Sequence, residues 1–158
     1  MNSPMISLAL YQPDIPQNTG AAIRLCACLG IGLHIIEPCG FRWDEKKIKH
    51  AAMDYYDALS FNRHASWDDF SDFAGGENAR RVLLTTKADM SYACFTFREN
   101  DILIAGQESA GVPDDVHNAC EAAIRVPMKK GLRSLNVITA SAMIVGEALR
   151  QRKGFAND

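Results

Sequence analysis

The chain has 158 residues, of which 47% are hydrophobic, and this is sufficient for one domain with a buried core. With 23% charged and 8% aromatic residues, the composition excludes disordered, collagen-like and low-complexity chains. The 17 basic and 19 acidic residues give a net charge of −2, so a nucleic-acid site would have to gather its basic residues on one face or across two subunits.

The first 30 residues predict a strand followed by a helix. Residues 5–11 form an apolar run closed by Gln12-Pro13-Asp14, which indicates a buried strand that leads into a loop. The apolar residues after this loop recur at helical spacing: Ala22, Leu25, Cys26 and Leu29. We expect Asn18 or Thr19 to cap this helix and Gly30 to lie near its end.

The rest of the chain alternates between predicted strands and predicted helices. Further strands are expected at residues 33–36, 81–85, 101–105 and 123–126. Helices are expected at residues 44–59, 67–73 and 113–120, and in a stripe of Leu135, Ile138, Ala142, Val145 and Leu149. This alternation predicts an α/β sandwich with a mostly parallel sheet, as a single domain over residues 1–158.

Targeting signals and paired cysteines are missing from the sequence. No apolar run approaches the ~18 residues of a membrane span, and residues 1–5 lack the features of a secretory signal. We therefore expect a cytoplasmic protein without a membrane partner. The five cysteines form no C-x-x-C pair, so we expect free thiols and no metal site: Cys26, Cys28, Cys39, Cys94 and Cys120.

The loops after the strands are the candidate ligand site, because open α/β sheets bind ligands beyond the carboxyl ends of their strands. The loop at residues 16–20 leads into a helix start, where free backbone N–H groups favour anions. It lacks G-x-G-x-x-G, which argues against a Rossmann-type site for NAD or FAD. Arg24 should point away from the core, either as an ordinary solvated residue or as a ligand of a phosphate or hydroxyl group.

Two later loops carry side chains suited to a ligand. The loop at residues 106–113 has two glycines, which permit close backbone approach, with Glu108 between them. The loop at residues 126–136 combines apolar residues that can enclose an adenine-sized ring with the hydrogen-bonding groups of Ser134 and Asn136. Each loop also has an ordinary structural interpretation, as a solvated carboxylate, a helix cap at Ser134 or surface cations.

Three motifs follow one another in this chain: N-T-G-x-x-x-R at 18–24, G-x-E-S-x-G-V-P at 106–113 and V-P-M-x-x-x-x-R-S-L-N at 126–136. Together with L-H-I-I-E-P at 33–38 and L-T-T-K at 84–87, they closely resemble the SPOUT superfamily of RNA methyltransferases. The nearest match is its short branch, the TrmL- or YibK-like tRNA 2′-O-methyltransferases, and the resemblance covers nearly the whole chain.

The resemblance implies an α/β fold whose C-terminal part forms a deep trefoil knot, and a homodimer with sites at the subunit interface. It implies S-adenosylmethionine as the methyl donor, bound in the knot, with S-adenosylhomocysteine as the product and no metal. The implied cofactor-binding residues are Leu84, Thr85, Gly106, Val126, Met128, Leu132 and Ser134. The implied catalytic residues are Arg24, Glu108 and Asn136.

The implied reaction is attack of a ribose 2′-hydroxyl on the sulfonium methyl group. The family is proposed to use the arginine of the first motif, here Arg24 of the partner subunit, as the base. Because a guanidinium group keeps its proton, we expect Arg24 to clamp the adjacent phosphate and order the hydroxyl, with Asn136, Ser134 and Glu108 in support.

Chain length favours the wobble nucleotide of tRNA as the substrate, because larger relatives carry an added RNA-binding domain for which 158 residues leave no room. The expected target is therefore cytidine or uridine 34 in the tRNA anticodon stem-loop. The basic residues expected to hold the RNA are Lys46, Lys47, Lys49, Lys129, Lys130, Arg133, Arg150, Arg152 and Lys153.

Some positions depart from the family's pattern: Gln107 stands where proline is commoner, residues 137–139 are Val-Ile-Thr, and Gly146 replaces the tyrosine of some relatives. Three alternatives stay open. The first is a non-catalytic knotted RNA-binding protein, and the second is a 2′-O-methyltransferase of another RNA. The third is a hydrolase that pairs a cysteine with one of the four histidines, His34, His50, His64 and His117, although no motif pairs them.

Overall fold

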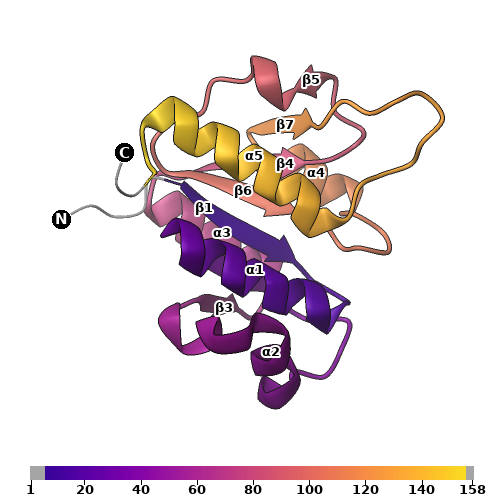
Figure 1. Cartoon of the computed structure of the whole chain (residues 1–158). Helices are drawn as coiled ribbons and strands as arrows, with labels where there is room; N and C mark the ends of the chain where they lie inside the picture. Colours follow the sequence, from indigo (N-terminus) through magenta and orange to yellow (C-terminus); the bar gives the residue numbers. More distant parts are fainter. Residues whose placement is uncertain (1–5, 156–158) are drawn as a thin grey trace.

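The computed structural model describes residues 6–155, and a parallel sheet forms its centre (Figure 1). The strands of this part are β1 (Ile6–Tyr11), β2 (Gly32–Ile36), β3 (Asn62–His64), β4 (Arg80–Leu84), β5 (Met90–Ser91), β6 (Asp101–Ala105) and β7 (Ala122–Arg125). They lie side by side in the order β3-β2-β1-β6-β4-β7-β5, and every pair of neighbours is parallel. The predicted α/β class with a parallel sheet is confirmed.

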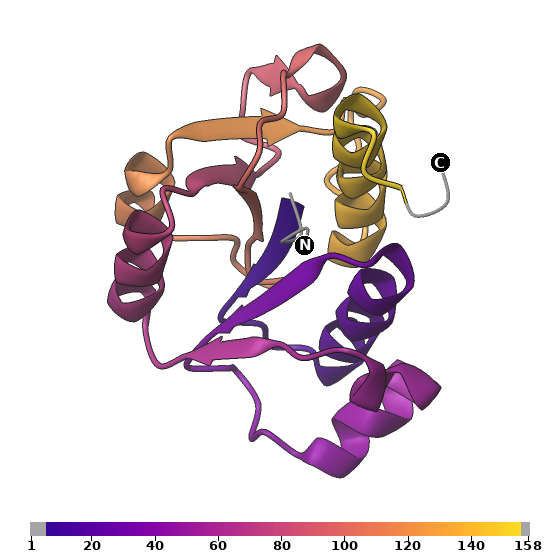
Figure 2. The same ribbon diagram turned by 90° about the vertical axis from the view of Figure 1, so that its left-hand side faces the viewer.

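Helices cover both faces of the sheet. They are α1 (Pro16–Leu29), α2 (Glu45–Ala52), α3 (Trp67–Gly76), α4 (Asp114–Ala119) and α5 (Val137–Arg152), with 3₁₀ turns η1 (Met53–Ala58) and η2 (Tyr92–Cys94). Figure 2 shows α1, α2 and α5 along one face and α3 and α4 against the other. Each face has its own buried hydrophobic cluster, which includes Ile23 and Val145 on the first and Phe70 and Val116 on the second.

The start of α1 differs from the prediction. The helix begins at Pro16 with Ile15 at the N-cap position, so Asn18 and Thr19 lie in its first turn and neither is the cap. The fixed φ of proline suits the first helical position, which explains the earlier start. The end agrees with the prediction, since Gly30 is the C-cap with a φ of 68°. Residues 1–5 lie outside the described residues. They include the whole segment in which no secretory signal was found and, at residue 5, the start of the predicted strand.

The stretch predicted as one helix over residues 44–59 is two elements. Helix α2 ends at Ala52, and Met53 adopts φ 58° and ψ −135°, after which the chain forms η1. Helix α3 extends past the predicted end at residue 73 and includes both Gly75 and Gly76.

Helix α5 also begins differently. Asn136 is its N-cap, with the side chain accepting hydrogen bonds from the backbone N–H groups of Ile138 and Thr139. Leu135 therefore precedes the helix and does not belong to its buried stripe, and Ser134 is not the cap. Similarly, Pro113 is the N-cap of α4 and lies just before its first turn.

Candidate active site

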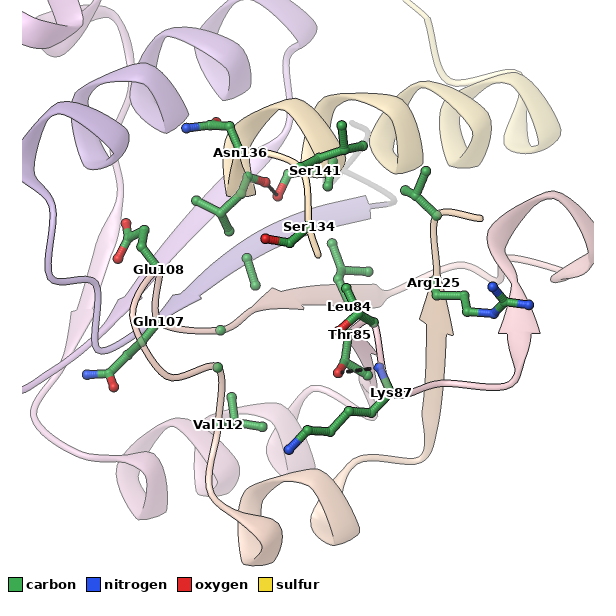
Figure 3. Close-up of a pocket in the computed structure, with 18 of the residues that line it drawn as sticks. Leu84, Thr85, Lys87, Gln107, Glu108, Val112, Arg125, Ser134, Asn136 and Ser141 are labelled. Atoms are coloured by element: carbon green, nitrogen blue, oxygen red, sulfur yellow. Dashed lines mark hydrogen bonds between the residues drawn. The ribbon is translucent and has the colours of Figure 1, made fainter. Parts of the chain in front are cut away.

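A cavity of about 630 Å³ lies at the carboxyl ends of β4, β6 and β7 (Figure 3). Most of its wall comes from the last residues of these strands and the loops that follow them, at residues 84–87, 105–112, 124–126 and 128. The N-terminal part of α5 and the residues just before it close the opposite side. The cavity therefore lies at the sheet edge that the sequence predicted, and its size is typical of a ligand site.

The cavity has an apolar wall and a polar rim. Its apolar lining residues include Leu84, Ala105, Ile124, Val126, Val137 and Ile144. Its polar lining residues include Asn18, Thr85, Lys87, Glu108, Ser134, Asn136 and Ser141. Such a lining suits a ligand with a flat apolar part and several hydrogen-bonding groups.

A tight loop after β6 forms one side of the rim. Gln107 and Gly111 exchange two backbone hydrogen bonds, of 2.8 and 2.9 Å, and Gly111 has a φ of 64°. A Cβ atom on Gly106 would lie 2.8 Å from the Cα atom of Gly111, so the loop closes only over a glycine. The side chain of Gln107 donates a hydrogen bond of 2.9 Å to the carbonyl oxygen of Gln12 and so ties the loop to the end of β1.

A polar network at the rim joins the three sequence motifs. The carboxylate of Glu108 accepts hydrogen bonds from the backbone N–H of Asp14 at 2.9 Å and from Nδ2 of Asn18 at 3.3 Å. Oδ1 of Asn18 accepts a hydrogen bond from Nδ2 of Asn136, also at 3.3 Å. Since Asn136 also caps α5, the first turn of α1, the loop after β6 and the start of α5 are held together at the cavity.

Asp14 also belongs to this network, although it lies outside all three motifs. The hydroxyl of Ser109 donates a hydrogen bond to its carboxylate. Burial raises the pKa of Glu108, and a hydrogen bond with the Asp14 side chain raises it further. The same bond and that of Ser109 lower the pKa of Asp14, so the two carboxyl groups titrate as a pair. The only sequence signal for Asp14 is a carboxylate in the loop after β1, at the same sheet edge.

Two cations line the cavity on the side away from α1. Lys87 follows β4, and its backbone N–H donates a hydrogen bond of 3.2 Å to Oγ1 of Thr85. The side chain of Arg125 extends toward β5, where its Nε lies 3.5 Å from the carbonyl oxygen of Asp89 (Figure 3). Of the two, Arg125 directs its guanidinium group away from the other lining residues, so Lys87 is the cation that lies opposite the Glu108 carboxyl group.

Most of the site residues expected from the sequence line this one cavity: Leu84, Thr85, Gly106, Glu108, Val126, Met128, Ser134 and Asn136. Leu132 does not line it and is 68% exposed in the loop before α5. Arg24 is also outside it, exposed on α1 as predicted, where its Nη1 donates a hydrogen bond of 3.0 Å to Sδ of Met53. One chain therefore does not bring Arg24 to the cavity.

Two of the cations expected to hold RNA are engaged in ion pairs. Lys49 lies 3.2 Å from Glu45, and Arg150 lies 2.7 Å from Glu147. Arg152 is partly buried. The others are exposed: Lys46, Lys47, Lys129, Lys130, Arg133 and Lys153.

Three of the thiols and two of the histidines are in surroundings that do not suit a nucleophilic pair. Burial raises the pKa of Cys26 to about 12 and those of Cys39 and Cys120 to about 11, so these thiols keep their protons at neutral pH. Nδ1 of His34 lies 3.0 Å from Nε2 of His64, so these two histidines pair with each other. Within residues 6–155, no group of three or more His, Cys, Asp or Glu side chains has the arrangement of a metal site.

The chain is similar to known RNA-modifying proteins over nearly its whole length. The SpoU rRNA Methylase family matches residues 5–146. The tRNA (cytidine(34)-2′-O)-methyltransferase of Beijerinckia indica subsp. indica is 51% identical over 144 residues, which are 91% of this chain and 90% of that protein. The Escherichia coli (strain K12) protein of the same name is 41% identical over 150 residues, covering 93% and 94% of the two chains. A solved structure concerned with the 2-OH methylation of C/U34 on tRNA has a TM-score of 0.89 at 36% identity and covers 97% of this chain and 99% of that one.

Proposed function

The chain belongs to the SpoU rRNA methylase family, and we propose that it transfers a methyl group from S-adenosylmethionine to the ribose 2′-hydroxyl of cytidine or uridine 34 of tRNA. The family membership confirms the resemblance drawn from the motifs. The convergence of three separated motifs on one cavity carries the assignment. Relatives with this activity are 41–51% identical to the chain.

The cavity fits the proposed methyl donor. Leu84, Ile124 and Val126 supply an apolar wall for an adenine ring, while Thr85 and Ser134 offer hydroxyl groups to a ribose. The carboxyl group of Glu108 and the ammonium group of Lys87 match the mixed charges of a sulfonium amino acid. When bound, S-adenosylmethionine supplies an electrophilic methyl group, and S-adenosylhomocysteine is the product.

The chain's own residues orient the acceptor hydroxyl. Asn136 and Glu108 are both held by Asn18, so their positions at the rim are set before RNA arrives. We assign these two side chains to placing the ribose and the arginine that approaches it. This pre-organisation matters because a neutral hydroxyl is a weak nucleophile unless its geometry is fixed and its proton is removed.

Arg24 of a second copy of the chain completes the site in this proposal, and a homodimer is therefore required. Its guanidinium group clamps the phosphate next to nucleotide 34 and orders the hydroxyl. Two observations support a partner chain: Arg24 lies outside the cavity of its own chain, and residues 129–136 beside the cavity are exposed throughout. Exposed Leu132 and Leu135 in this loop and Met143 on α5 offer apolar surface for such a contact.

Family membership also supports three finer proposals: a C-terminal trefoil knot, one methyltransferase domain over residues 1–158, and a cytoplasmic location with the tRNA anticodon stem-loop as partner. The exposed cations near the cavity, Lys129, Lys130 and Arg133, suit contact with RNA phosphates. No helix within residues 6–155 is long and apolar enough to cross a bilayer.

The direct test measures transfer of a labelled methyl group to purified tRNA, followed by mass spectrometry of its nucleosides. We expect 2′-O-methylcytidine or 2′-O-methyluridine at position 34 and no transfer to a matched tRNA with a 2′-deoxynucleotide there. Cofactor binding without transfer to any RNA would favour the non-catalytic RNA-binding protein. Transfer to ribosomal RNA alone would favour the methyltransferase of another RNA.

A mixing experiment tests the shared site. Arg24→Ala chains keep the cofactor cavity, and Gly106→Ala chains keep the arginine. At an S-adenosylmethionine concentration that saturates the wild type but lies far below the raised Kd of Gly106→Ala, each variant alone should show almost no activity. If Arg24 acts across the interface, random mixed dimers contain one complete site in half of the molecules and recover about a quarter of wild-type activity. If Arg24 acts in its own chain, mixing recovers nothing.

A further inference from the structure

Arg24 is held by a sulfur atom and an aromatic ring, both from η1. Its Nη1 donates a hydrogen bond of 3.0 Å to Sδ of Met53. The central carbon of its guanidinium group lies 5.3 Å from the ring centroid of Tyr55. Within residues 6–155, no carboxylate lies within salt-bridge distance of Arg24.

Other arginines of the molecule also stack on rings, but they are neutralised. Arg63 lies over Trp43 and is 2.6 Å from Glu37. Arg80 lies over Phe95 and is 2.7 Å from Asp101, and Arg81 over Trp67 is 2.8 Å from Glu121. Ring and sulfur contacts direct a guanidinium group without cancelling its charge, whereas a carboxylate competes with any phosphate for it. Arg24 is thus oriented while its charge stays available.

A close contact between α1 and α2 brings η1 to Arg24. A Cβ atom on Gly20 would lie 2.3 Å from the Cβ of Ala51 and 2.8 Å from its carbonyl carbon, so only a glycine permits this approach. Gly20 and Arg24 are four residues apart and share one face of α1. Ala51 lies just before Met53 and Tyr55, so the contact at Gly20 sets the distance at Arg24.

The backbone at Met53 directs its side chain to Arg24. Its φ of 58° is in the left-handed region, which L residues rarely adopt and keep only where the surroundings impose it. Core packing does not account for it, because Met53 is 57% exposed. Its sulfur atom accepts the hydrogen bond from the guanidinium group.

We infer that Met53 and Tyr55 are positioning residues that hold the Arg24 guanidinium group by a sulfur atom and a ring face, leaving its charge for an RNA phosphate. The inference rests on the proposed function, in which Arg24 clamps the phosphate next to the methylated nucleotide. Gly20 sets the helix approach that makes the two contacts possible.

Substitution of Tyr55 tests the inference. Loss of the ring in Tyr55→Leu should lower kcat at saturating tRNA and S-adenosylmethionine about tenfold, since the cation–π contact no longer orients Arg24. Tyr55→Phe keeps the ring face and should stay within about twofold of the wild type. Met53→Leu keeps the size but removes the sulfur, and we expect a loss of about threefold. Affinity for S-adenosylmethionine should not change in any of them, because these residues lie outside the cavity.

A double variant separates positioning from a purely structural role. In an Arg24→Ala background, Tyr55→Leu should cause no further loss of rate, because the group that it orients is absent. Tyr55→Leu with a lowered melting temperature but wild-type kcat below that temperature would overturn the inference, as would equal losses in Tyr55→Leu and Tyr55→Phe. Full turnover of Arg24→Ala would overturn the proposed role of Arg24 and the inference with it. Full turnover of Tyr55→Leu beside an inactive Arg24→Ala overturns the inference alone.

Discussion

Helix α1 takes part in two regions of the molecule that differ in their surroundings. Near its start, Asn18 joins Glu108 and Asn136 in a polar network at the cavity. Further along, Arg24 contacts Met53 and Tyr55 of η1. Six residues of α-helix separate the two side chains by about 120° around the axis and about 9 Å along it. A single chain therefore builds the cavity but directs Arg24 away from it, and this is the arrangement that the proposed contribution of Arg24 from a second chain requires.

The largest effect should come from Arg24→Ala, which removes the guanidinium group that contacts Met53 and Tyr55 and leaves the polar network at the cavity unchanged. We expect the rate of methyl transfer to fall about 1,000-fold, because the proposed phosphate clamp and the proposed ordering of the hydroxyl are lost together. Affinity for S-adenosylmethionine, measured by titration calorimetry, should stay the same. Arg24→Lys is the matched control and should recover part of the rate, since it keeps the charge without the planar fork. Weakened cofactor binding in Arg24→Ala would contradict the separation of the two regions.

Gly106→Ala should have the opposite effect to Arg24→Ala, since it should weaken cofactor binding at the cavity and leave the surroundings of Arg24 unchanged. The added Cβ meets the backbone of Gly111 at 2.8 Å, so the loop that carries Glu108 must shift. We expect affinity for S-adenosylmethionine to fall about a hundredfold. Gly75→Ala on α3 is the matched control, because a Cβ atom there has no neighbour within 4 Å, and it should bind the cofactor normally. Normal binding by Gly106→Ala would refute this position for the cofactor.

The His34–His64 pair gives a reference that belongs to neither region. His34 is 6% exposed and packs against Phe70 and Phe73, and burial, with a smaller contribution from His64, lowers its pKa to about 4. The unfolded chain binds a proton at this position below about pH 6.5, whereas the folded chain does not until about pH 4. The free energy of unfolding is therefore highest above pH 6.5, where both states carry a neutral His34. It falls by at most ~3 kcal/mol as the pH drops toward 4.

Urea unfolding at pH 7.5 and pH 5 measures this loss. His34→Gln should flatten the dependence of stability on pH while leaving the rate of methyl transfer per folded molecule unchanged. An equally steep dependence in His34→Gln would show that other groups cause it.

Glu108→Gln should have the smallest of these effects, and it tests whether the polar network at the cavity contributes to the reaction. The glutamine keeps the shape of the side chain, but one carboxylate oxygen is replaced by an NH2 group. This group faces either the backbone N–H of Asp14 or Nδ2 of Asn18, both of which are donors, so one of these two hydrogen bonds is lost. We expect kcat/KM for tRNA to fall about tenfold, measured under single-turnover conditions. Glu99→Gln, at an exposed position on the surface, is the control and should behave as the wild type. An unchanged rate in Glu108→Gln would remove this network from the reaction.

The strands that the sequence predicted are the longer ones, of four to six residues, and each contains at least one buried apolar residue. Strands β3 and β5 were missed because three and two residues are too few to show a pattern. The end of α2 also differs from the prediction, because Met53 has a positive φ of 58°, and no residue type in the stretch 44–59 marks such a conformation in advance.

Site residues that lie in a sequence motif could be predicted. Site residues that come together only in the folded chain could not. Glu108 and Asn136 lie in motifs and line the cavity. Asp14 lies in no motif, and its partner Glu108 is 94 residues further along the chain. The partners of Arg24 could not be predicted for the same reason, because Met53 is 29 residues further along the chain and reaches Arg24 only once η1 has packed against α1.

The place of β1 in the sheet has a consequence for biosynthesis. Its neighbour β2 leaves the ribosome soon afterwards, but its other neighbour β6 begins only at Asp101, and the helix that closes the cavity begins at Val137. A nascent chain therefore carries an unpaired hydrophobic strand edge for about 95 residues of translation, which exposes it to aggregation. Premature termination before Asp101 would release a fragment with that edge permanently open, and such a fragment should depend on chaperones or be degraded.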